Sequence, residues 1–359
     1  MMLKSYSLAQ LQQQVFIGLL AGAVGFAGWQ GHQAARVEGP RPLADGSYQR
    51  QYESTFAGAL PGRSLGTEFF AAAKLALLGE MAEGAVMGRD GWLFTTEELM
   101  PPKHVYDLAA ELQAARGHLD PLGVQLLPVI LPDKARVHAA KLPRRRSAPY
   151  QQRYPKAQAL LAAAGYPVVD SLRALRAEGF MRTDTHWTPA GARAVAAEIA
   201  ALLPTRDSRD RGDFETVALE TAPFDGDLTR FAATGRFGGW AGITPEAIQT
   251  YETHSHVVQD LFGDVEIPVV LVGSSFSANP AFHFEGFLKS ALGQDVLNMA
   301  QVGRGPFAPM HAYLGSEELR ENPPEIVIWE IPERYLSLEP SPAQMPPLKI
   351  SHTQNSQGD

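Results

Sequence analysis

Short runs composed almost wholly of apolar residues recur along the chain, and segments with helical spacing separate them. The runs at residues 124–131, 267–272 and 325–331 are short and lack the polar alternation of a strand with one face in water. Strands of a parallel sheet have this continuously apolar pattern, because helices cover both faces of the sheet. The sequence therefore predicts an α/β fold, with a mostly parallel sheet flanked by helices.

Other segments fit the same fold. The spacing of apolar residues predicts helices over residues 69–81, 105–115, 151–164, 190–203 and 281–292. Short apolar runs predict further strands over residues 167–169 and 295–299. Within residues 87–94, Gly88 and Asp90-Gly91 mark a turn that leads into a short aromatic strand. Residues 206–259 lack this alternation and are predicted to be an insertion that borders the site.

The length, net charge and cysteine content of the chain limit its domain number, its partners and its chemistry. A chain of 359 residues favours one sizeable domain with insertions. The formal net charge of −8 argues against nucleic acid as a partner, and the one arginine run, residues 144–146, is expected on a solvated loop. The chain contains no cysteine, which excludes thiol catalysis, disulfides and cysteine metal ligands.

The N-terminal segment at residues 15–29, VFIGLLAGAVGFAGW, is apolar and uncharged. We prefer an uncleaved signal anchor, with a cleaved signal peptide or a buried core helix as alternatives. The expected organisation is a signal anchor over 1–30, a linker over 31–47, a folded domain over 48–338 and an irregular tail over 339–359.

A candidate nucleophile follows one of the buried strands. The strand at 267–272 leads directly into Gly273, Ser274 and Ser275. Active groups gather at the carboxyl ends of such strands, where glycine permits a sharp turn. Ser275 is therefore the predicted nucleophile, and its backbone N–H is a candidate donor to a tetrahedral oxyanion. The alternative is that these serines only cap turns and helices.

A candidate base lies upstream, just before a strong helix start at Thr188-Pro189. Asp184 is spaced to accept the Nδ1 proton of His186, which leaves Nε2 to take a proton from a hydroxyl. The alternatives are a structural pair or a metal site, and we expect no metal because no other metal-spaced string accompanies the pair. The pair His254 and His256 lies in a polar stretch further along the chain and is expected to be solvated.

Two further segments follow strand ends. The Gly303 N–H is a candidate second oxyanion donor beside Arg304, or the segment is an ordinary turn. Farther on, Arg334 and Tyr335 are candidates for binding a substrate carboxylate or supporting the site. For Arg334 the alternative is a local salt bridge to the neighbouring glutamates at positions 330 or 333.

Six strings taken in order resemble one known family. They are GRDGWLF at 88–94, PDKARVHAAKLP at 132–143, TDTHWTPAG at 183–191, GSSFS at 273–277, GRGPF at 303–307 and IWEIPERYL at 328–336. Together they resemble the AlgJ/AlgX family of SGNH hydrolase-like proteins, which is implicated in the O-acetylation of bacterial exopolysaccharides such as alginate. The family places Asp-x-His before the serine, so the resemblance implies a triad of Asp184, His186 and Ser275.

Two departures qualify the resemblance. Ser274 stands where an ordinary SGNH esterase has aspartate, as the acetyltransferase branch tends to have a small hydroxyl residue there. AlgX-like members carry a C-terminal carbohydrate-binding module, whereas only a short tail follows residue 338 here. The chain therefore looks more like the membrane-anchored AlgJ type.

The resemblance implies an O-acetyltransferase that works through a serine-linked acetyl group, without a cofactor, in the periplasm at the bacterial inner membrane. The implied partners are a membrane-bound O-acyltransferase as acetyl donor, other exopolysaccharide acetylation and export proteins, and a glycan acceptor. The alternatives are a carbohydrate acetylesterase and a non-catalytic scaffold of the acetylation or export complex.

Overall fold

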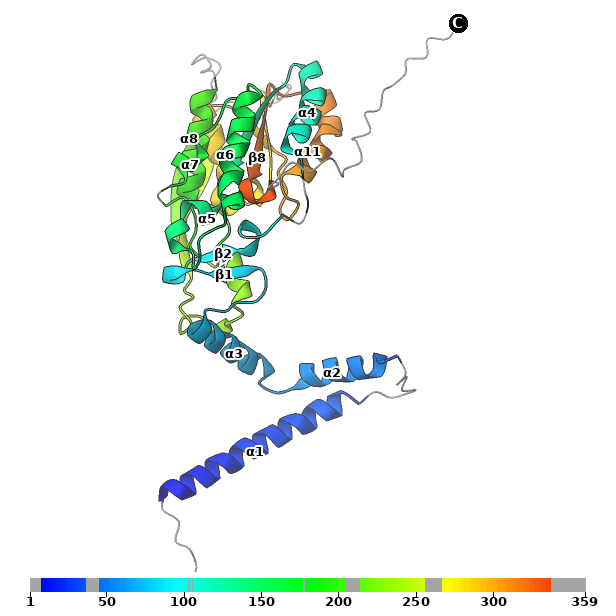
Figure 1. Cartoon of the computed structure of the whole chain (residues 1–359), viewed down its shortest axis with the longest axis vertical. Helices are drawn as coiled ribbons and strands as arrows, with labels where there is room; N and C mark the ends of the chain where they lie inside the picture. Colours follow the sequence, from blue (N-terminus) through cyan, green and yellow to red (C-terminus); the bar gives the residue numbers. More distant parts are fainter. Residues whose placement is uncertain are drawn as a thin grey trace, which may run out of the picture. The chain divides into compact units, whose positions relative to one another are not determined.

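The computed structural model describes residues 8–36, 45–102, 104, 106–176, 178–203, 214–255 and 267–336. The chain forms two compact units, one of residues 1–77 with 233–241 and one of residues 78–232 with 242–359. Figure 1 follows the chain through both. The second unit contains every residue predicted for the site.

A four-stranded parallel sheet forms the centre of the second unit. Its strands lie in the order β3 (Gln125–Leu131), β8 (Ile326–Pro332), β6 (Val269–Val272) and β7 (Val296–Asn298). All three pairings are parallel. The predicted parallel sheet is thus confirmed, and the carboxyl ends of these strands meet at one edge.

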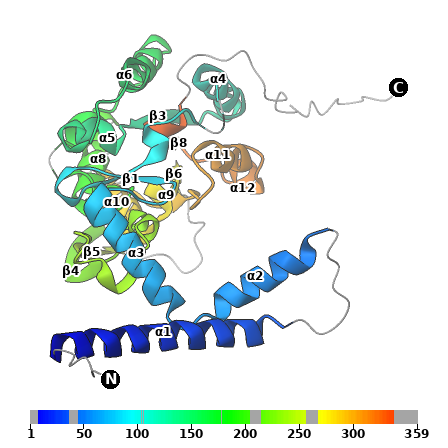
Figure 2. The same cartoon turned by 60° about the horizontal axis from the view of Figure 1, so that its bottom comes forward.

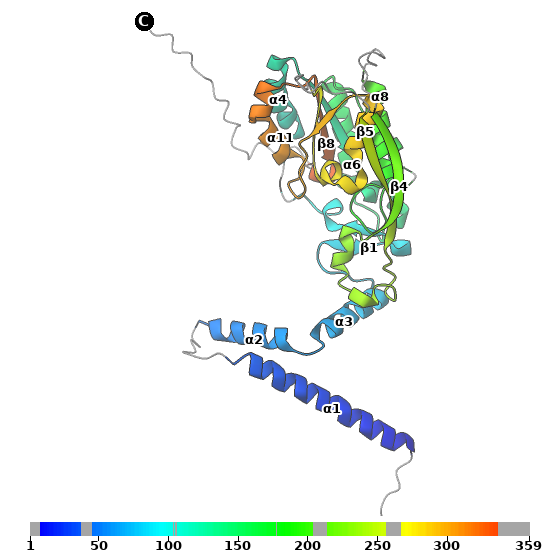
Figure 3. The same ribbon diagram turned by 180° about the vertical axis from the view of Figure 1, so that it is seen from behind.

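Helices cover both faces of this sheet. The helices on one face are α8 (Pro189–Leu202) and α10 (Phe284–Leu292). The helices on the other face are α4 (Leu108–Leu119), α6 (Ala148–Ala163) and α11 (Phe307–Leu314). On β6, Val269 and Leu271 join the first core, whereas Val270 and Val272 join the second. Figures 2 and 3 show β8 between α11 on one side and α8 on the other. Burial on both faces explains why these strands are continuously apolar.

Two antiparallel pairs accompany the sheet. The first is the hairpin of β1 (Ala85–Met87) and β2 (Leu93–Thr95), which places the predicted turn at Asp90-Gly91. The second is a long ribbon of β4 (Phe214–Phe224) and β5 (Glu246–Ser255), with a register shift between Ala218 and Thr221. The strands of this ribbon, of 11 and 10 residues, therefore make up half of the described part of the predicted insertion, residues 214–255.

The remaining helices are α1 (Leu8–Ala34), α2 (Ser47–Ala59), α3 (Arg63–Leu78), α5 (Lys134–Val137), α7 (Ser171–Ala174), α9 (Ser275–Ala278) and α12 (Glu317–Glu321). The strand predicted at 167–169 is wrong, because this segment is irregular and leads into α7. Pro167 supplies no backbone donor there. His256 and the tail after residue 336 lie outside the described residues.

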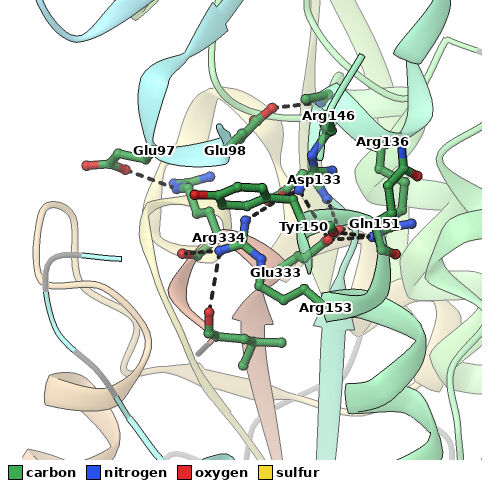
Figure 4. Close-up of polar contacts among 12 residues, drawn as sticks. Glu97, Glu98, Asp133, Arg136, Arg146, Tyr150, Gln151, Arg153, Glu333 and Arg334 are labelled. Carbon is green, nitrogen blue, oxygen red and sulfur yellow. Dashed lines mark hydrogen bonds and ion pairs between the residues drawn. The ribbon is translucent and has the colours of Figure 1, made fainter. Parts of the chain in front are cut away.

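A buried network of ion pairs closes the carboxyl ends of β3 and β8 (Figure 4). Asp133 follows β3 and accepts from Arg146 at 2.6 Å and from Arg153 at 3.3 Å. Glu333 follows β8, pairs with Arg136 at 2.6 Å and accepts the backbone N–H of Asp133 at 3.0 Å. These contacts fix the ends of two neighbouring strands relative to each other.

The network corrects the prediction that the whole arginine run is solvated. Arg144 and Arg145 are exposed, but Arg146 is buried against Asp133. Burial and the neighbouring Glu333 raise the pKa of the Asp133 carboxyl well above its usual value. Buried carboxylates need such partners, because an uncompensated charge in the interior is costly.

The Arg146→Met substitution tests this compensation. We expect it to lower the free energy of unfolding by about 3 kcal/mol, since it leaves Asp133 with Arg153 alone. Urea unfolding measures the change. The matched control is Arg145→Met at the exposed neighbouring position, where a change within about 0.5 kcal/mol is expected. Equal effects of both substitutions would contradict the role given to Arg146.

Candidate active site

Asp184, His186 and Ser275 form one continuous chain of hydrogen bonds. The Asp184 carboxylate lies 2.6 Å from Nδ1 of His186, and Nε2 of His186 lies 2.8 Å from Oγ of Ser275. A carboxylate accepts only, so Nδ1 carries the proton and Nε2 accepts the serine hydroxyl hydrogen. The geometry matches the one expected from the sequence.

The loop that carries Asp184 and His186 is fixed at both sides. Thr188 caps α8 by accepting the N–H of Gly191 at 3.0 Å, as its sequence predicts. Trp187 is fully buried and forms an isolated antiparallel bridge with Phe180. The large indole therefore anchors the loop in the core next to the histidine.

The second oxygen of Asp184 is also occupied. It accepts the backbone N–H of Asp227 at 2.7 Å, while the first oxygen accepts the backbone N–H of His186 at 2.8 Å. Burial opposes ionisation of Asp184, but the hydrogen bonds and charge of His186 together with the N–H of Asp227 outweigh it. The pKa of this carboxyl therefore lies below its usual value. Asp184 is thus held as an anion that orients the imidazole.

Ligand atoms of Asp184, His186 and Asp227 lie within 4.8 Å of one another, close enough to consider a metal ion. Both ring nitrogens of His186 already face partners, and both Asp184 oxygens accept N–H groups. Asp227 accepts the N–H of Thr185 at 2.7 Å. This donor set fits a proton relay better than a metal centre.

Lys134 is a residue that sequence reasoning missed. Its fully buried ammonium group donates to the backbone carbonyls of Leu93 at 2.5 Å, Arg182 at 2.9 Å and Asp184 at 2.9 Å. The three bonds tie the β1–β2 hairpin to the loop of the candidate triad. Burial lowers the pKa of this lysine to about 8.

Ser275 stands at the start of α9, directly beyond the end of β6. Its side chain is only partly covered, whereas Ser274 and Phe276 on either side are buried. Within the described residues, its backbone N–H donates no hydrogen bond. The nucleophile predicted from the sequence is therefore partly accessible to solvent, and its N–H has no acceptor in the part of the chain that the structure describes.

Glu330 of β8 supports the turn that presents Ser275. Its buried carboxylate accepts the N–H of Ser274 at 2.8 Å and the hydroxyl of Ser277 at 3.1 Å. Gly273 is required at this point, because a Cβ there would lie 2.6 Å from Oε2 of Glu330. Burial raises the pKa of Glu330 above its usual value.

Aromatic side chains surround the imidazole of His186. Its ring stacks on Phe282 with centroids 5.2 Å apart and meets Phe276 edge-on at 4.7 Å. Phe276 in turn packs against Trp187 at 5.3 Å. This apolar wall holds the ring and reduces the space for water beside it.

The remaining candidates, Gly303, Arg304, Arg334 and Tyr335, occupy two places. Gly303 and Arg304 lie exposed in the turn beyond β7, near the serine turn, since Gln301 donates to the carbonyl of Gly273 at 3.2 Å. No hydrogen bond joins either residue to the candidate triad within the described residues. Their proposed roles stay predictions.

Arg334 is buried with its guanidinium carbon 5.2 Å from the ring centroid of Phe276 and 5.0 Å from that of Tyr335. Its ion pair is with Glu97 at 3.3 Å, whereas Glu333 pairs with Arg136 (Figure 4). The local salt bridge considered from the sequence is thus replaced by a pair with a distant segment. Arg334 contacts the residue next to Ser275, and a role in substrate binding stays a prediction.

An Asp-x-His loop beside a serine that follows a buried parallel strand defines an α/β protein of the serine hydrolase type. A model of the "SGNH hydrolase-like domain, acetyltransferase AlgX" family matches residues 85–333. The chain belongs to this family, and the resemblance described from its motifs is confirmed.

Relatives match along most of the chain. The "probable alginate O-acetylase AlgJ" of Pseudomonas putida is 37% identical, over 95% of this chain and 93% of that protein. The protein of the same name from Pseudomonas aeruginosa is 35% identical, over 92% of this chain and 91% of that protein.

Solved structures agree with the fold. The O-acetyltransferase domain of Pseudomonas putida AlgJ gives a TM-score of 0.63 at 34% identity and covers 75% of this chain and 96% of that domain. Pseudomonas aeruginosa AlgX gives 0.55 at 28% identity and covers 71% of this chain and 63% of that protein. The SGNH hydrolase-like α/β fold is therefore shared with both.

The Glu330→Gln substitution tests the support beneath the serine turn. The amide replaces one acceptor oxygen with a donor that faces the donors of Ser274. We expect kcat toward an activated acetyl ester to fall by about tenfold, the equivalent of about 1.4 kcal/mol, with KM unchanged. The control Ser277→Ala removes one donor and keeps the acceptor, so a smaller loss is expected. A wild-type kcat in Glu330→Gln would refute the assignment.

His138 gives a prediction about pH. Its ring packs against that of Trp92 with centroids 4.0 Å apart and planes tilted by 33°. Burial together with Lys134 and Lys141 lowers the pKa of His138 to about 4. Since the unfolded chain takes up this proton near pH 6.5, the free energy of unfolding falls as pH drops from 6.5 to 4. Allowing for partial exposure, we expect His138 to account for about 1–2 kcal/mol of that loss.

The measurement compares urea unfolding of wild type and His138→Phe at pH 7 and at pH 4.5. Phenylalanine keeps the packing surface but does not titrate, so the variant should lose less stability on acidification. Equal losses in the two proteins would show that His138 is already protonated when folded.

Proposed function

We propose that this protein is an O-acetyltransferase that modifies hydroxyl groups of an exopolysaccharide, alginate or a similar polymer, through an acetyl group carried on Ser275. The observation that carries the proposal is the hydrogen-bonded series of Asp184, His186 and Ser275. The relatives named alginate O-acetylase and the solved AlgJ O-acetyltransferase domain support the same activity.

In the first half-reaction, Oγ of Ser275 attacks the acetyl carbonyl carbon while Nε2 of His186 takes the hydroxyl proton. Asp184 stabilises the imidazolium that forms, since its carboxylate already accepts the Nδ1 proton. The donor oxygen leaves with the proton from Nε2, which regenerates neutral His186 and leaves an acetyl ester on Ser275.

In the second half-reaction, a sugar hydroxyl takes the place of the leaving group. Nε2 of His186 removes its proton, the sugar oxygen attacks the acetyl carbon, and Ser275 leaves with that proton returned to Oγ. The backbone N–H of Ser275 is the proposed donor to the oxyanion in both steps. Transfer requires that the sugar outcompete water, and the packing of Phe276 and Phe282 around His186 favours this.

The location that we propose is the periplasmic side of the bacterial inner membrane. Helix α1 includes a segment of 20 residues, Val15–Ala34, that is long and apolar enough to cross a membrane and is largely exposed. An uncleaved anchor at 1–30, a linker at 31–47, a catalytic domain at 48–338 and a tail at 339–359 are the corresponding proposed parts. A membrane-bound O-acyltransferase is the proposed acetyl donor, and other acetylation and export proteins are the proposed partners.

Intact mass spectrometry of the full chain in detergent, after exposure to an activated acetyl ester, tests the nucleophile. We expect one added acetyl group on the wild type and none on Ser275→Ala, because the variant lacks the attacking oxygen. His186→Ala should slow acetylation by at least about 10²-fold, as general-base catalysis contributes on that order. Equal acetylation of wild type and Ser275→Ala would contradict the proposal, and no acetylation of either would favour a non-catalytic scaffold.

A further inference from the structure

Helix α3 carries an exposed apolar stripe. Leu65, Phe69 and Leu77 are spaced by multiples of four residues, and Phe70 lies beside them. At about 100° per residue these side chains fall within about 140° of the helix circumference. All four are exposed, with Phe70 at 70% and Leu77 at 79% of full accessibility. Exposed apolar surface on this scale marks an interaction site.

Aromatic residues of a distant segment in the same compact unit extend the stripe. Trp240 stacks on Phe69 with ring centroids 5.9 Å apart and planes 4° apart, and Phe237 meets Phe69 edge-on at 5.5 Å. Trp240 remains 58% exposed. Tryptophan favours the boundary between water and lipid, where its ring is partly buried. Phenylalanine is common on the apolar face of helices that lie in that boundary.

The side of α3 away from the stripe is polar. Ser64 lies about 170° and Thr67 about 130° around the helix from the centre of the stripe. Both residues are exposed. The charges of α3 and residues 233–241 are Arg63, Lys74, Arg236 and one glutamate, which leaves a net positive charge. An amphipathic helix with aromatic residues on one face and basic residues elsewhere is typical of a helix that lies in the membrane surface.

The chain itself keeps α3 near a bilayer. Residues 35–62 join α1 to α3, and they include the 13 residues of α2. With α2 helical and the rest extended, this segment spans at most about 70 Å. A short tether to a membrane raises the local concentration of the surface that it can reach, so weak apolar contacts become sufficient. This step rests on the membrane anchor proposed above.

We propose that the apolar stripe of α3, together with Trp240, docks onto the surface of the bilayer that α1 spans. The stripe would then insert at the level of the lipid headgroups, with the polar side of the helix in water. Such docking limits the distance between the membrane and the unit that contains the candidate triad. It would therefore favour acetyl transfer from a donor embedded in the same membrane.

The absence of native cysteine permits a direct test with single nitroxide labels on the full chain in lipid nanodiscs. Labels at Phe70→Cys and Leu77→Cys report on the stripe, and labels at Ser64→Cys and Thr67→Cys are the matched controls on the polar side. A fifth label at Val24→Cys reports on α1. Paramagnetic resonance then measures collision with oxygen, which partitions into lipid, and with a water-soluble nickel chelate.

We expect labels 70 and 77 to gain oxygen collisions and lose nickel collisions relative to labels 64 and 67. If label 24 lies in lipid while labels 70 and 77 collide with nickel as often as the controls, the docking proposal is overturned and the anchor stands. If label 24 itself is in water, the anchor and the docking both fail. If labels 70 and 77 lose collisions with both reagents, a protein covers the stripe, which also overturns docking onto lipid.

Discussion

The fully buried ammonium group of Lys134 joins the parts of the chain that make the site. It lies just beyond the carboxyl end of β3 and donates to the carbonyls of Leu93, Arg182 and Asp184. A charge in the interior is tolerated only when its hydrogen-bonding groups are satisfied, so these three segments must converge on the ammonium group. Asp184 is thereby fixed through its backbone, which leaves its carboxylate free to orient His186. The geometry of the candidate triad therefore depends on a residue that touches none of its reacting atoms.

Buried charged groups also need hydrogen-bond partners along the whole carboxyl edge of the sheet. Glu330 at the end of β8 is buried and accepts from the serine turn, while Asp133 and Glu333 accept from arginines that arrive from other segments. Each group occupies a position where a parallel sheet brings strand ends together. Because an unpaired buried carboxylate is costly, these contacts favour one arrangement of the edge. A rigid edge suits a site whose candidate nucleophile and candidate base lie 89 positions apart in the chain.

Features set by local sequence could be predicted, and those set by distant partners could not. The apolar strand before Gly273 and the Thr188-Pro189 helix start determine where Ser275 and His186 lie, so both were found from the sequence. Lys134 and Glu330 form hydrogen bonds with partners 41 to 56 positions away, and no local sequence pattern predicts such contacts. Arg146 was misjudged for this reason, since its partner Asp133 is buried by tertiary packing. The segment at 167–169 has an apolar composition, but Pro167 and the exposed Val168 do not suit a sheet strand.

The proposed function requires that acetyl passes from Ser275 to a sugar hydroxyl in preference to water. A single-turnover experiment tests this most directly: full-length protein carrying isotope-labelled acetyl on Ser275 is mixed with an oligosaccharide of the exopolysaccharide, and acetylated sugar and free acetate are quantified over time. The proposed function predicts that labelled acetyl appears mainly on the oligosaccharide and that the acetyl-enzyme decays faster as acceptor concentration rises. Decay that yields only acetate, at a rate independent of the acceptor, would contradict it and identify an esterase.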